Sequence, residues 1–357
     1  MRARKGRGAV SNASGRFEPC ARVAVDDGWP ADDDAPPPRI ATEVTMETVR
    51  TVISHNASPD LPFDRSINPY RGCEHGCVYC YARPSHAYLG LSPGLDFESR
   101  LFAKPGASEA LARELSKPGY RVRPIMVGAN TDPYQPIEGR LEVTRGILRV
   151  LDAFSHPVMI TTKSDRIVRD LDLLGAMARR GLVSVAISLT TLGPTLARTL
   201  EPRAPTPSKR LTAIERLSAA GVPLVVLAAP MIPCVNDHEL ERILKAARDA
   251  GAVGAGYAML RLPLELKDIF TEWLDAHVPG KTRHVLSLLR QSRKGALYDP
   301  SFATRMRGAG PHADLLAQRF AVSCRRLGLS RGMPTVAALR GDLFAVPPRK
   351  GDQLSLF

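Results

Sequence analysis

The sequence predicts an α/β fold built on a parallel sheet. From about residue 120, short apolar runs rich in β-branched residues alternate with amphipathic segments whose apolar positions recur every three to four residues. Repeated strand–helix units place helices outside a parallel sheet, which is either doubly wound or curled into a barrel. Both arrangements gather functional side chains at the carboxyl ends of the strands.

Five apolar runs are the expected strands. Each is bounded by Gly, Pro or polar residues, as strands usually are. The runs are Ile125–Ala129, Val158–Thr162, Val183–Leu189, Pro223–Ala229 and Ala255–Leu262. Polar side chains stand at or just after their carboxyl ends, namely Asn130, Thr131, Asp132, Lys163, Ser188 and Arg261.

Three amphipathic segments between these runs are the expected helices. Their apolar stripes are Ile147, Leu148, Leu151 and Phe154; Ile167, Leu171, Leu174 and Ala178; and Leu240, Ile243, Leu244 and Ala247. Asn236 or Asp237 is expected to cap the third helix, with Glu239 reaching back as in a capping box.

Three regions are expected along the chain. Residues 1–60 are rich in Gly, Pro, Asp and Arg without a sustained period, so we expect an extended or partly disordered arm. Residues 61–265 hold the predicted sheet and form the core. Residues 266–357 are expected to form a basic, mostly helical extension.

Composition and charge describe a globular chain with an excess of basic residues. The chain has 357 residues, 44% hydrophobic and 24% charged, which excludes a fully disordered or collagen-like protein. Its net charge is +13, and residues 281–357 contain 14 basic and 4 acidic residues. Basic clusters such as Arg305/Arg307, Arg325/Arg326 and Arg349/Lys350 suit nucleic acid. A solvated surface in an Arg-rich protein, with 39 Arg and 10 Lys, is the alternative.

The sequence favours a cytoplasmic protein. The basic start is not followed by the apolar run of a secretory signal. The uncharged stretch from Leu217 to Asn236 contains three prolines, so we interpret it as helix end, turn and buried strand rather than a membrane span. Six cysteines are too few for a disulfide scaffold in a chain of this length.

A cluster of three cysteines is the strongest functional signal. Cys73, Cys77 and Cys80 lie within eight residues, and thiolates suit soft metals and iron–sulfur clusters. A [4Fe–4S] cluster usually takes four cysteines, so three leave one iron open to a substrate or cofactor. The alternative is a closed zinc site that adds His75 or His86. Zinc sites usually pair two short cysteine clusters, and the chain has no second cysteine pair.

The Cys-x3-Cys-x2-Cys spacing resembles the radical S-adenosylmethionine (SAM) superfamily. Residues 66–73 and 130–136 are similar to the branch related to spore photoproduct lyase, often labelled "DNA repair photolyase", and to uncharacterised bacterial proteins of that branch. The resemblance is strongest from about residue 60 to 265. It implies a partial (β/α)6 barrel with the cysteine loop after the first strand.

The resemblance also implies the chemistry. The three cysteines would hold a [4Fe–4S] cluster, whose open iron is chelated by the amino and carboxylate groups of SAM. Reduction cleaves SAM to methionine and a 5′-deoxyadenosyl radical, which abstracts hydrogen from the substrate. The implied partner is an electron donor of the flavodoxin or ferredoxin type.

Five residues take cofactor or catalytic roles by the same resemblance. Asn130 and Thr131 match the place of the SAM amino group, and Lys163 and Ser188 match the place of its carboxylate or ribose. Tyr81 matches an aromatic residue near SAM. Plainer interpretations are a polar turn for Asn130 and Thr131, a solvated lysine for Lys163 and a core serine for Ser188.

Arg203 and Cys234 are further candidates. Arg203 is a weaker candidate for a residue that binds the SAM carboxylate. The alternative interpretation is that Arg203 forms a surface ion pair with Glu201 at a helix end. Cys234 stands where related proteins usually have Gly. It is either an inert buried thiol or a donor that returns hydrogen to a product radical.

The sequence does not identify the substrate. Spore photoproduct lyase relies on a cysteine at the end of its second strand, whereas this chain has Ala129 followed by Asn130 and Thr131. This departure argues against thymine-dimer repair, and nucleic acid is a candidate but not an established substrate for lyase-like repair or modification. The alternative function is a non-catalytic iron–sulfur redox or sensor protein, or a nucleic-acid-binding module.

Overall fold

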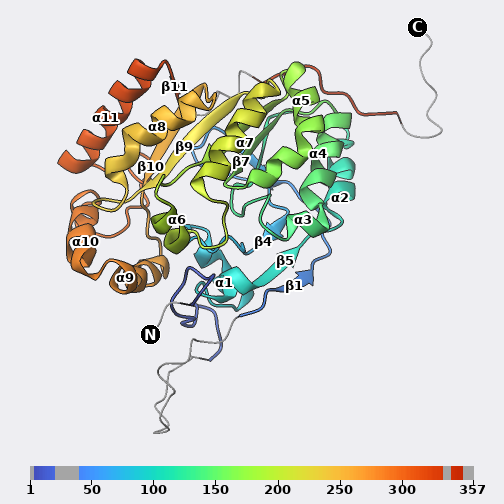
Figure 1. Cartoon of the computed structure of the whole chain (residues 1–357). Helices are drawn as coiled ribbons and strands as arrows, with labels where there is room; N and C mark the ends of the chain where they lie inside the picture. The colour runs from blue at the N-terminus through green and yellow to red at the C-terminus, as the bar shows by residue number, and fades with distance from the viewer. Residues whose placement is uncertain (1–3, 21–39, 333–338, 349–357) are drawn as a thin grey trace.

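A computed structural model describes residues 4–20, 40–332 and 339–348 of the chain. Its centre is a sheet with helices packed against it, and the described parts of the C-terminal region add helices beside one edge (Figure 1). The basic pair Arg349/Lys350 lies outside the described residues.

The expected parallel sheet is confirmed. The main sheet has the order β11-β10-β9-β8-β7-β6-β3-β2 among the described residues. Besides the edge strand β11, six strands of this sheet run parallel and lie side by side in chain order. They are β3 (Arg65–Ile67), β6 (Ile125–Val127), β7 (Val158–Thr162), β8 (Val183–Ser188), β9 (Leu224–Met231) and β10 (Gly254–Met259).

All five strands expected from the sequence are therefore present, with ends shifted by up to three residues. Strand β3 was missed because three residues are too short for a period to show. The antiparallel β2 (Ser54–His55) and the parallel β11 (Ser330–Arg331) complete the sheet as its edge strands. Closure into a barrel stays a prediction, because the pairing of strands follows a linear order.

A second, small sheet precedes the helical crossovers. It has the order β1-β5-β4, formed by β1 (Glu43–Met46), β4 (Tyr70–Arg71) and β5 (Arg100–Ala103). Strand β4 directly precedes the cysteine loop, and β5 follows it in the chain. The small sheet therefore brings together the two ends of the segment that carries the cysteines.

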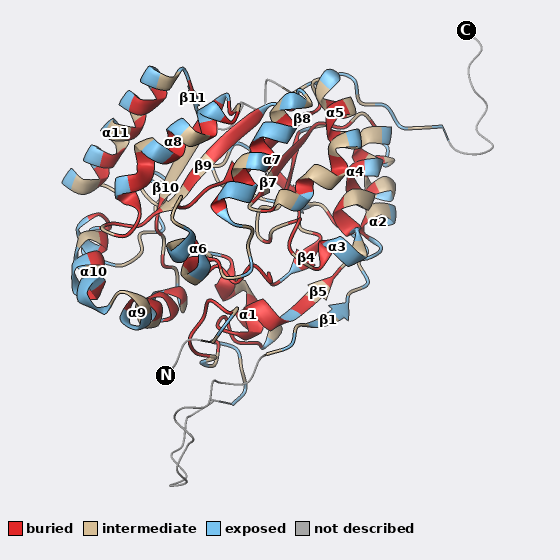
Figure 2. Cartoon of the chain, in the orientation of Figure 1, coloured by how far each residue is buried: buried red, intermediate tan, exposed pale blue. Residues whose placement is uncertain are grey.

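The crossover helices follow the apolar stripes of the sequence. They are α2 (Ala107–Leu115), α4 (Val143–Ala153), α5 (Leu171–Arg179), α7 (Pro207–Ala219) and α8 (Leu240–Asp249). Their buried faces and the sheet form the main core, which is visible as the red faces in Figure 2. The second amphipathic segment begins as the 3-10 helix η2 (Asp165–Asp170) before it becomes α5.

The capping box expected before α8 is wrong. The residue at its N-cap position is Glu239, which makes no side-chain capping bond. Its carboxylate instead accepts from the Thr191 hydroxyl at 2.7 Å, and Asn236 Oδ1 accepts from the backbone N of Ile232 at 2.6 Å. These polar side chains are buried, so they satisfy the loops at the ends of β8 and β9 rather than the helix.

The remaining helices complete the described chain. Short ones are η1 (Arg83–Leu89), α1 (Asp96–Ser99), α3 (Glu138–Leu141), α6 (Pro194–Leu200), η3 (Asp237–Glu239) and η4 (Pro279–Lys281). Longer ones are α9 (Leu266–His277), α10 (Thr282–Gln291) and α11 (Pro311–Leu327), of which α11 packs on α8 and β10. Among the described residues, no helix has the length and apolar character needed to cross a bilayer.

Arg293 joins the C-terminal region to the end of β10. Its guanidinium is buried and donates to the carbonyls of Leu260 at 2.9 Å, Thr304 at 2.9 Å and Arg305 at 2.7 Å. Burial, followed by the charge of nearby Arg261, lowers the pKa of Arg293 to about 10. The cross-link is therefore made by a buried cation and backbone dipoles.

We expect Arg293→Leu to lower the free energy of unfolding by about 3 kcal/mol, because it leaves several buried carbonyls without donors. Urea unfolding followed by circular dichroism measures the change. Arg290→Leu, at an exposed position of α10, is the matched control and should change stability by less than about 0.5 kcal/mol. Equal effects of the two variants would contradict the role of Arg293.

Candidate functional site

Three free cysteines lie in one loop between β4 and η1. Cys73 and Cys77 are buried and Cys80 is half-buried. The loop turns tightly at Gly72 and Gly76, whose φ angles of 72° and 66° lie in the left-handed region. A Cβ on Gly76 would stand 2.7 Å from a carboxylate oxygen of Glu98, so glycine is required there by space as well as by conformation.

A buried arginine holds this loop in place. Arg83 is completely buried, and its guanidinium donates to the carbonyls of Cys77 at 2.8 Å, Gly76 at 3.2 Å and Gly94 at 2.9 Å. The same guanidinium forms an ion pair with Glu98, which is also completely buried. The Gly76 and Cys77 carbonyls of the loop are thereby bound to a buried cation.

The N-terminal residues close the outer side of the same loop. Glu98 accepts from the backbone N of Gly8 at 2.9 Å and of Ala9 at 2.8 Å, and Arg7 donates to the Glu98 carbonyl at 2.6 Å. A Cβ on Gly8 would stand 1.8 Å from the Gly76 carbonyl oxygen. Part of the segment expected as an extended arm therefore covers the cysteine loop.

The donor set fits an iron–sulfur cluster. Burial raises the pKa of the Cys77 thiol to about 12, and burial, Asp132 and the other two cysteines raise the pKa of Cys73. Three neighbouring thiolates in such a place need a compensating positive charge, which metal ions supply. The tightly turned loop leaves the three thiols for ligation, because its carbonyls are bound to Arg83.

The closed zinc site finds no support in the geometry. His75 Nδ1 lies 3.3 Å from Asp132 Oδ2, and His86 Nε2 lies 2.9 Å from the Arg100 carbonyl. In the described part of the chain, no three His, Cys, Asp or Glu side chains converge closely enough to hold a single metal ion. Ligands that each bind a different iron of one cluster need no such convergence.

Lys163 is the strand-end residue that lies beside the cysteine loop. Its ammonium stands 5.7 Å from the centre of the Tyr79 ring. Burial lowers the pKa of Lys163, but Cys77 and Glu201 together act more strongly and raise it above its usual value. Lys163 is therefore a cation held against the loop, and its contact with the SAM carboxylate stays a prediction.

Asn130 and Thr131 are placed by Asn68. The Asn68 side-chain oxygen accepts from the backbone N of Asn130 at 2.8 Å and of Thr131 at 3.4 Å. The buried Thr131 hydroxyl donates to the Tyr70 carbonyl at 3.0 Å. The Asn130 amide is half-buried and reaches the Ser85 hydroxyl only at 3.5 Å, so it is the better placed of the two for a ligand.

Ser188 and Arg203 make contacts with other residues of the chain. Ser188 is buried at the end of β8, where its carbonyl accepts from Arg210 at 3.2 Å. The expected pairing of Glu201 with Arg203 is wrong, because Glu201 forms its ion pair with Arg210. Arg203 lies 3.0 Å from a carboxylate oxygen of Glu74, directly after the first cysteine of the loop.

Tyr81 is open to solvent at the other end of the loop. Its side chain is 48% exposed, and its hydroxyl donates to the Ala129 carbonyl at the end of β6. The guanidinium of Arg261 stands 4.6 Å above the ring, which is a cation–π contact. Arg261 was identified as a polar strand end in the sequence but not as a partner of Tyr81.

Cys234 adopts a conformation suited to glycine. Its φ is 61°, and its backbone N donates to Asp237 Oδ1 at 3.0 Å. Side chains other than Gly, Asn and Asp rarely adopt this region, where a Cβ costs about 1–2 kcal/mol. The thiol is half-buried against the same apolar cluster as Cys80.

A buried network beneath the loop was missed. Glu201 accepts from the hydroxyls of Tyr79 and Thr190 and is paired with the buried Arg210. Burial would raise the pKa of Glu201, but the charges of Arg210 and Lys163 hold it at about 2. A signal existed in Tyr79, which lies between two of the cysteines, but no spacing rule pairs it with residues more than 100 positions away.

Sequence comparison decides the family. The sequence model of the "Radical SAM superfamily" matches residues 67–247, about half of the chain. The chain belongs to the radical SAM superfamily. Its cofactors are therefore those of the superfamily, a [4Fe–4S] cluster and SAM, and the resemblance drawn from the cysteine spacing is confirmed.

Relatives of the chain occur in bacteria and archaea. An uncharacterised protein of Mycobacterium tuberculosis is 36% identical over 302 residues, which is 80% of this chain and 88% of the relative. An uncharacterised protein of Methanocaldococcus jannaschii is 28% identical over 173 residues, or 48% of this chain and 62% of the relative.

The fold is similar to that of spore photoproduct lyase. A structure of that enzyme complexed with dinucleoside spore photoproduct has a TM-score of 0.57 and 15% identity over 81% of each chain. A mutant solved with bound AdoMet and the dinucleoside has the same TM-score, identity and coverage. At this identity the likeness concerns the fold alone, and the expected branch of the superfamily is consistent with it.

Arg83→Met is expected to abolish most cluster loading, because it leaves the buried Glu98 charge unpaired and frees the loop carbonyls. Iron and sulfide content after anaerobic reconstitution measures the effect. Arg100→Met is the control, because Arg100 is half exposed and lies 4.0 Å from its carboxylate partner. Normal iron content in folded Arg83→Met protein would contradict the anchoring role.

Proposed function

We propose that this chain is a radical SAM enzyme that cleaves SAM reductively and uses the product radical on a separate substrate. When bound, the cluster supplies one electron to SAM, which splits into methionine and a 5′-deoxyadenosyl radical that abstracts hydrogen. The observation that carries the proposal is the loop of three cysteines, two of them buried, which is fixed by Arg83 and bordered by the cation of Lys163.

Cys73, Cys77 and Cys80 are the proposed iron ligands. The other three cysteines are not part of this loop: Cys20 is exposed, Cys324 is buried in α11, and Cys234 follows β9. Three ligands leave one iron of the cluster open for a small molecule. An open iron distinguishes an enzyme from a closed electron carrier or sensor.

Three residues are the proposed contacts of SAM. Lys163 offers a point charge to the carboxylate, Asn130 offers a half-buried amide, and Tyr81 offers a ring capped by Arg261. Thr131 and Ser188 support the strand ends through buried positions. Arg203 is left out of the proposed contacts, because it is bound to Glu74 on another side of the loop.

Nucleic acid is the proposed substrate class. The solved neighbour binds a dinucleoside photoproduct, and this chain carries a net charge of +13 with Arg307, Arg325 and Arg326 exposed. Arg305 does not contribute, because its Nε and Nη2 atoms are bound to Asp60 at 2.5 Å. Lyase-like repair or modification is the proposed reaction type, with Cys234 as the candidate for hydrogen return.

Anaerobically reconstituted protein is expected to form 5′-deoxyadenosine from SAM and dithionite, whereas Cys77→Ala should form almost none. Liquid chromatography of the nucleoside gives the rate, with and without added DNA or RNA. The control is Cys324→Ala, which removes a buried thiol outside the loop. A fully loaded cluster that binds SAM but yields no 5′-deoxyadenosine in any mixture would favour the redox or sensor function.

Lys163→Met is expected to weaken SAM binding about tenfold or more, because a hydrogen bond to a charged group contributes about 1.5–3 kcal/mol. Calorimetric titration of the reconstituted protein measures the affinity, after iron content is shown to be normal. Lys163→Arg keeps the charge and should retain part of the binding. Unchanged affinity in Lys163→Met would remove Lys163 from the site.

A further inference from the structure

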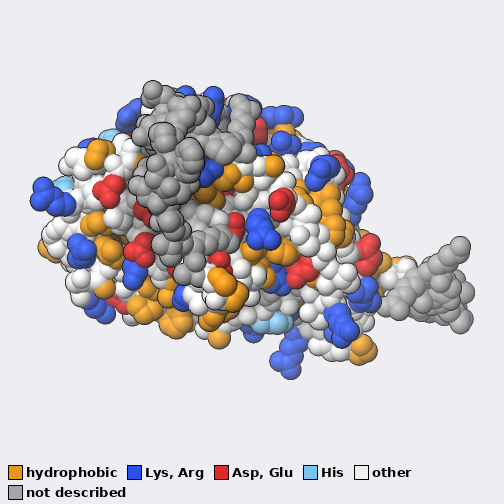
Figure 3. All heavy atoms as spheres, turned by 90° about the horizontal axis from the view of Figure 1, so that it is seen from below, with side chains coloured by type: hydrophobic (Ala, Val, Ile, Leu, Met, Phe, Trp, Pro, Cys, Tyr) orange, Lys and Arg blue, Asp and Glu red, His pale blue; other side chains and the backbone are white. Residues whose placement is uncertain are grey.

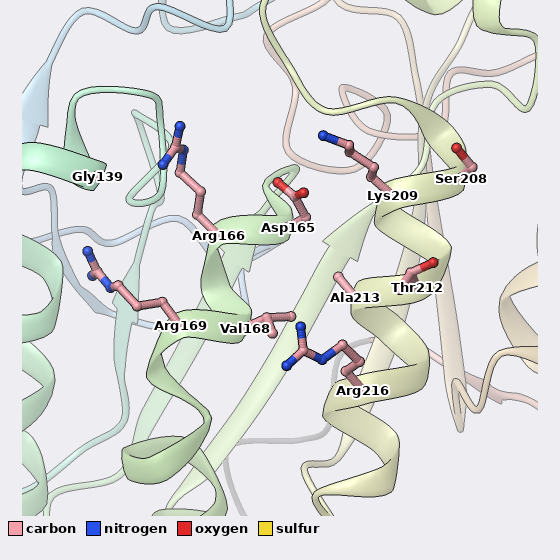
Figure 4. Close-up of a pocket in the computed structure, with 10 residues that line it drawn as sticks. All are labelled: Gly139, Asp165, Arg166, Val168, Arg169, Ser208, Lys209, Thr212, Ala213 and Arg216. Carbon is pink, nitrogen blue, oxygen red and sulfur yellow. The ribbon is translucent and has the colours of Figure 1, made fainter.

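Two adjoining pockets form a groove along the N-terminal half of α7. The first has a volume of about 500 Å³ and lies between η2 and α7, as Figure 4 shows. The second, of about 490 Å³, lies between the loop before α3 and the loops after β7 and α6. Asp165, Arg166 and Lys209 line both pockets, so we treat them as one feature and call it the basic groove.

The basic groove carries cations without acidic partners. Arg166, Lys209 and Arg216 are exposed, and within the described chain none of the three forms a salt bridge. Lys209 and Arg216 reach from α7 toward η2 (Figure 4). Arg169 also lines the groove but is neutralised by Glu138 and Asp170. Asp165 is the one acidic side chain among the lining residues of the two pockets.

One end of the groove lies beside the cysteine loop. His75 stands between Cys73 and Cys77 in the chain and lines the second pocket together with Arg203. The backbone N of Arg203 donates to the His75 carbonyl at 3.2 Å, and its guanidinium lies 3.0 Å from Glu74. A molecule seated in the groove would therefore lie beside Arg203, which is bound to His75 and Glu74 of the cysteine loop.

The loop has two accessible sides. One is the groove, and the other is the side of Tyr81, where the proposed function places SAM and substrate. None of Asn130, Lys163 and Tyr81 lines either pocket. A third side is closed by the segment around Gly8, whose backbone binds Glu98. A partner that must approach the cluster without competing with substrate would use the groove.

We propose that the basic groove docks an acidic protein that carries a low-potential redox group and delivers one electron to the cluster. The inference rests on the proposed function, since reductive SAM cleavage needs one electron and the chain has no second cysteine cluster to store it. The donor loses one electron and the cluster gains it, without transfer of atoms. The groove is favoured as the docking surface because it lies beside the cysteine loop, and electron tunnelling rates fall steeply with distance.

The positive charge of the groove favours an acidic partner. Unpaired cations attract an acidic protein during encounter and orient it, and such steering raises association rates by about 10–1,000-fold at low salt. On the uncovered part of the face shown in Figure 3, basic side chains are instead interspersed with acidic and apolar ones. Nucleic acid would also be attracted to cations, but its reacting base must reach the side of Tyr81.

The test compares two double variants with the same charge change. Lys209→Glu/Arg216→Glu alters the groove, and Lys117→Glu/Arg149→Glu alters exposed positions on the chain segment after α2 and on α4. Each reconstituted protein is reduced either by dithionite or by an acidic flavodoxin kept reduced by its NADPH-dependent reductase. Three quantities are measured: cluster reduction by electron paramagnetic resonance, 5′-deoxyadenosine formation, and the flavodoxin dissociation constant.

In the groove variant, we expect flavodoxin-driven reduction and 5′-deoxyadenosine formation to fall about tenfold or more, with a matching loss of flavodoxin affinity. The dithionite-driven rate should equal that of the unmodified protein, and the control variant should behave like the unmodified protein in both assays. Added salt should slow only the flavodoxin-driven reaction of the unmodified protein.

Three results would overturn the docking proposal: equal flavodoxin rates in the two variants, a fall of the dithionite-driven rate in the groove variant, or loss of DNA or RNA binding with flavodoxin affinity kept. The last result would make the groove a nucleic-acid site. If flavodoxin reduces the cluster in a groove-dependent way but no SAM is cleaved under any condition, the docking proposal stands and the proposed function fails.

Discussion

The buried ion pair of Arg83 and Glu98 is the constraint on which the rest of the site depends. Arg83 binds the carbonyls of the cysteine loop, and Glu98 binds the backbone of the N-terminal segment at Gly8 and Ala9. Both charges are taken out of water at a cost that only their mutual attraction and several hydrogen bonds can offset. The chain uses this pair where position matters most, because three thiols must be held at the spacing of an inorganic cluster.

A second buried pair repeats this principle under the loop. Glu201 and Arg210 lie beneath Tyr79, and their network includes the Thr190 hydroxyl at the end of β8. Interaction with Cys77 and Glu201 raises the pKa of Lys163, so this buried pair also helps to keep the lysine proposed to meet SAM protonated. The sheet and the cysteine loop are therefore joined by charge as well as by packing, which makes their relative position difficult to change.

The parts of the structure that were predictable from sequence are those set by local pattern. Strands β7 and β8 were found within one residue because they are buried runs rich in apolar and β-branched residues between breakers. The cysteine loop was found because its ligands are close in sequence. The partners of Glu98 at Gly8 and Ala9 and the partner of Glu201 at Tyr79 were not, because they are brought together by the fold from distant parts of the chain. The capping-box prediction failed because those side chains form hydrogen bonds with buried polar groups of the loops instead of with the helix end.

The two accessible sides of the cysteine loop carry different residues, and the difference follows from the topology. The 3-10 helix η2 after β7 and the first turn of α7 place Arg166 and Lys209 in the groove, whereas Lys163 and Tyr81 lie on the side of the proposed SAM site. In a fold with one cluster, electron delivery and substrate binding would compete if they used the same opening. A loop held from within by Arg83 can be approached from both sides without moving, because its carbonyls are already bound. Rigidity of the loop would thus let the proposed electron donor and the proposed substrate use separate routes to the cluster.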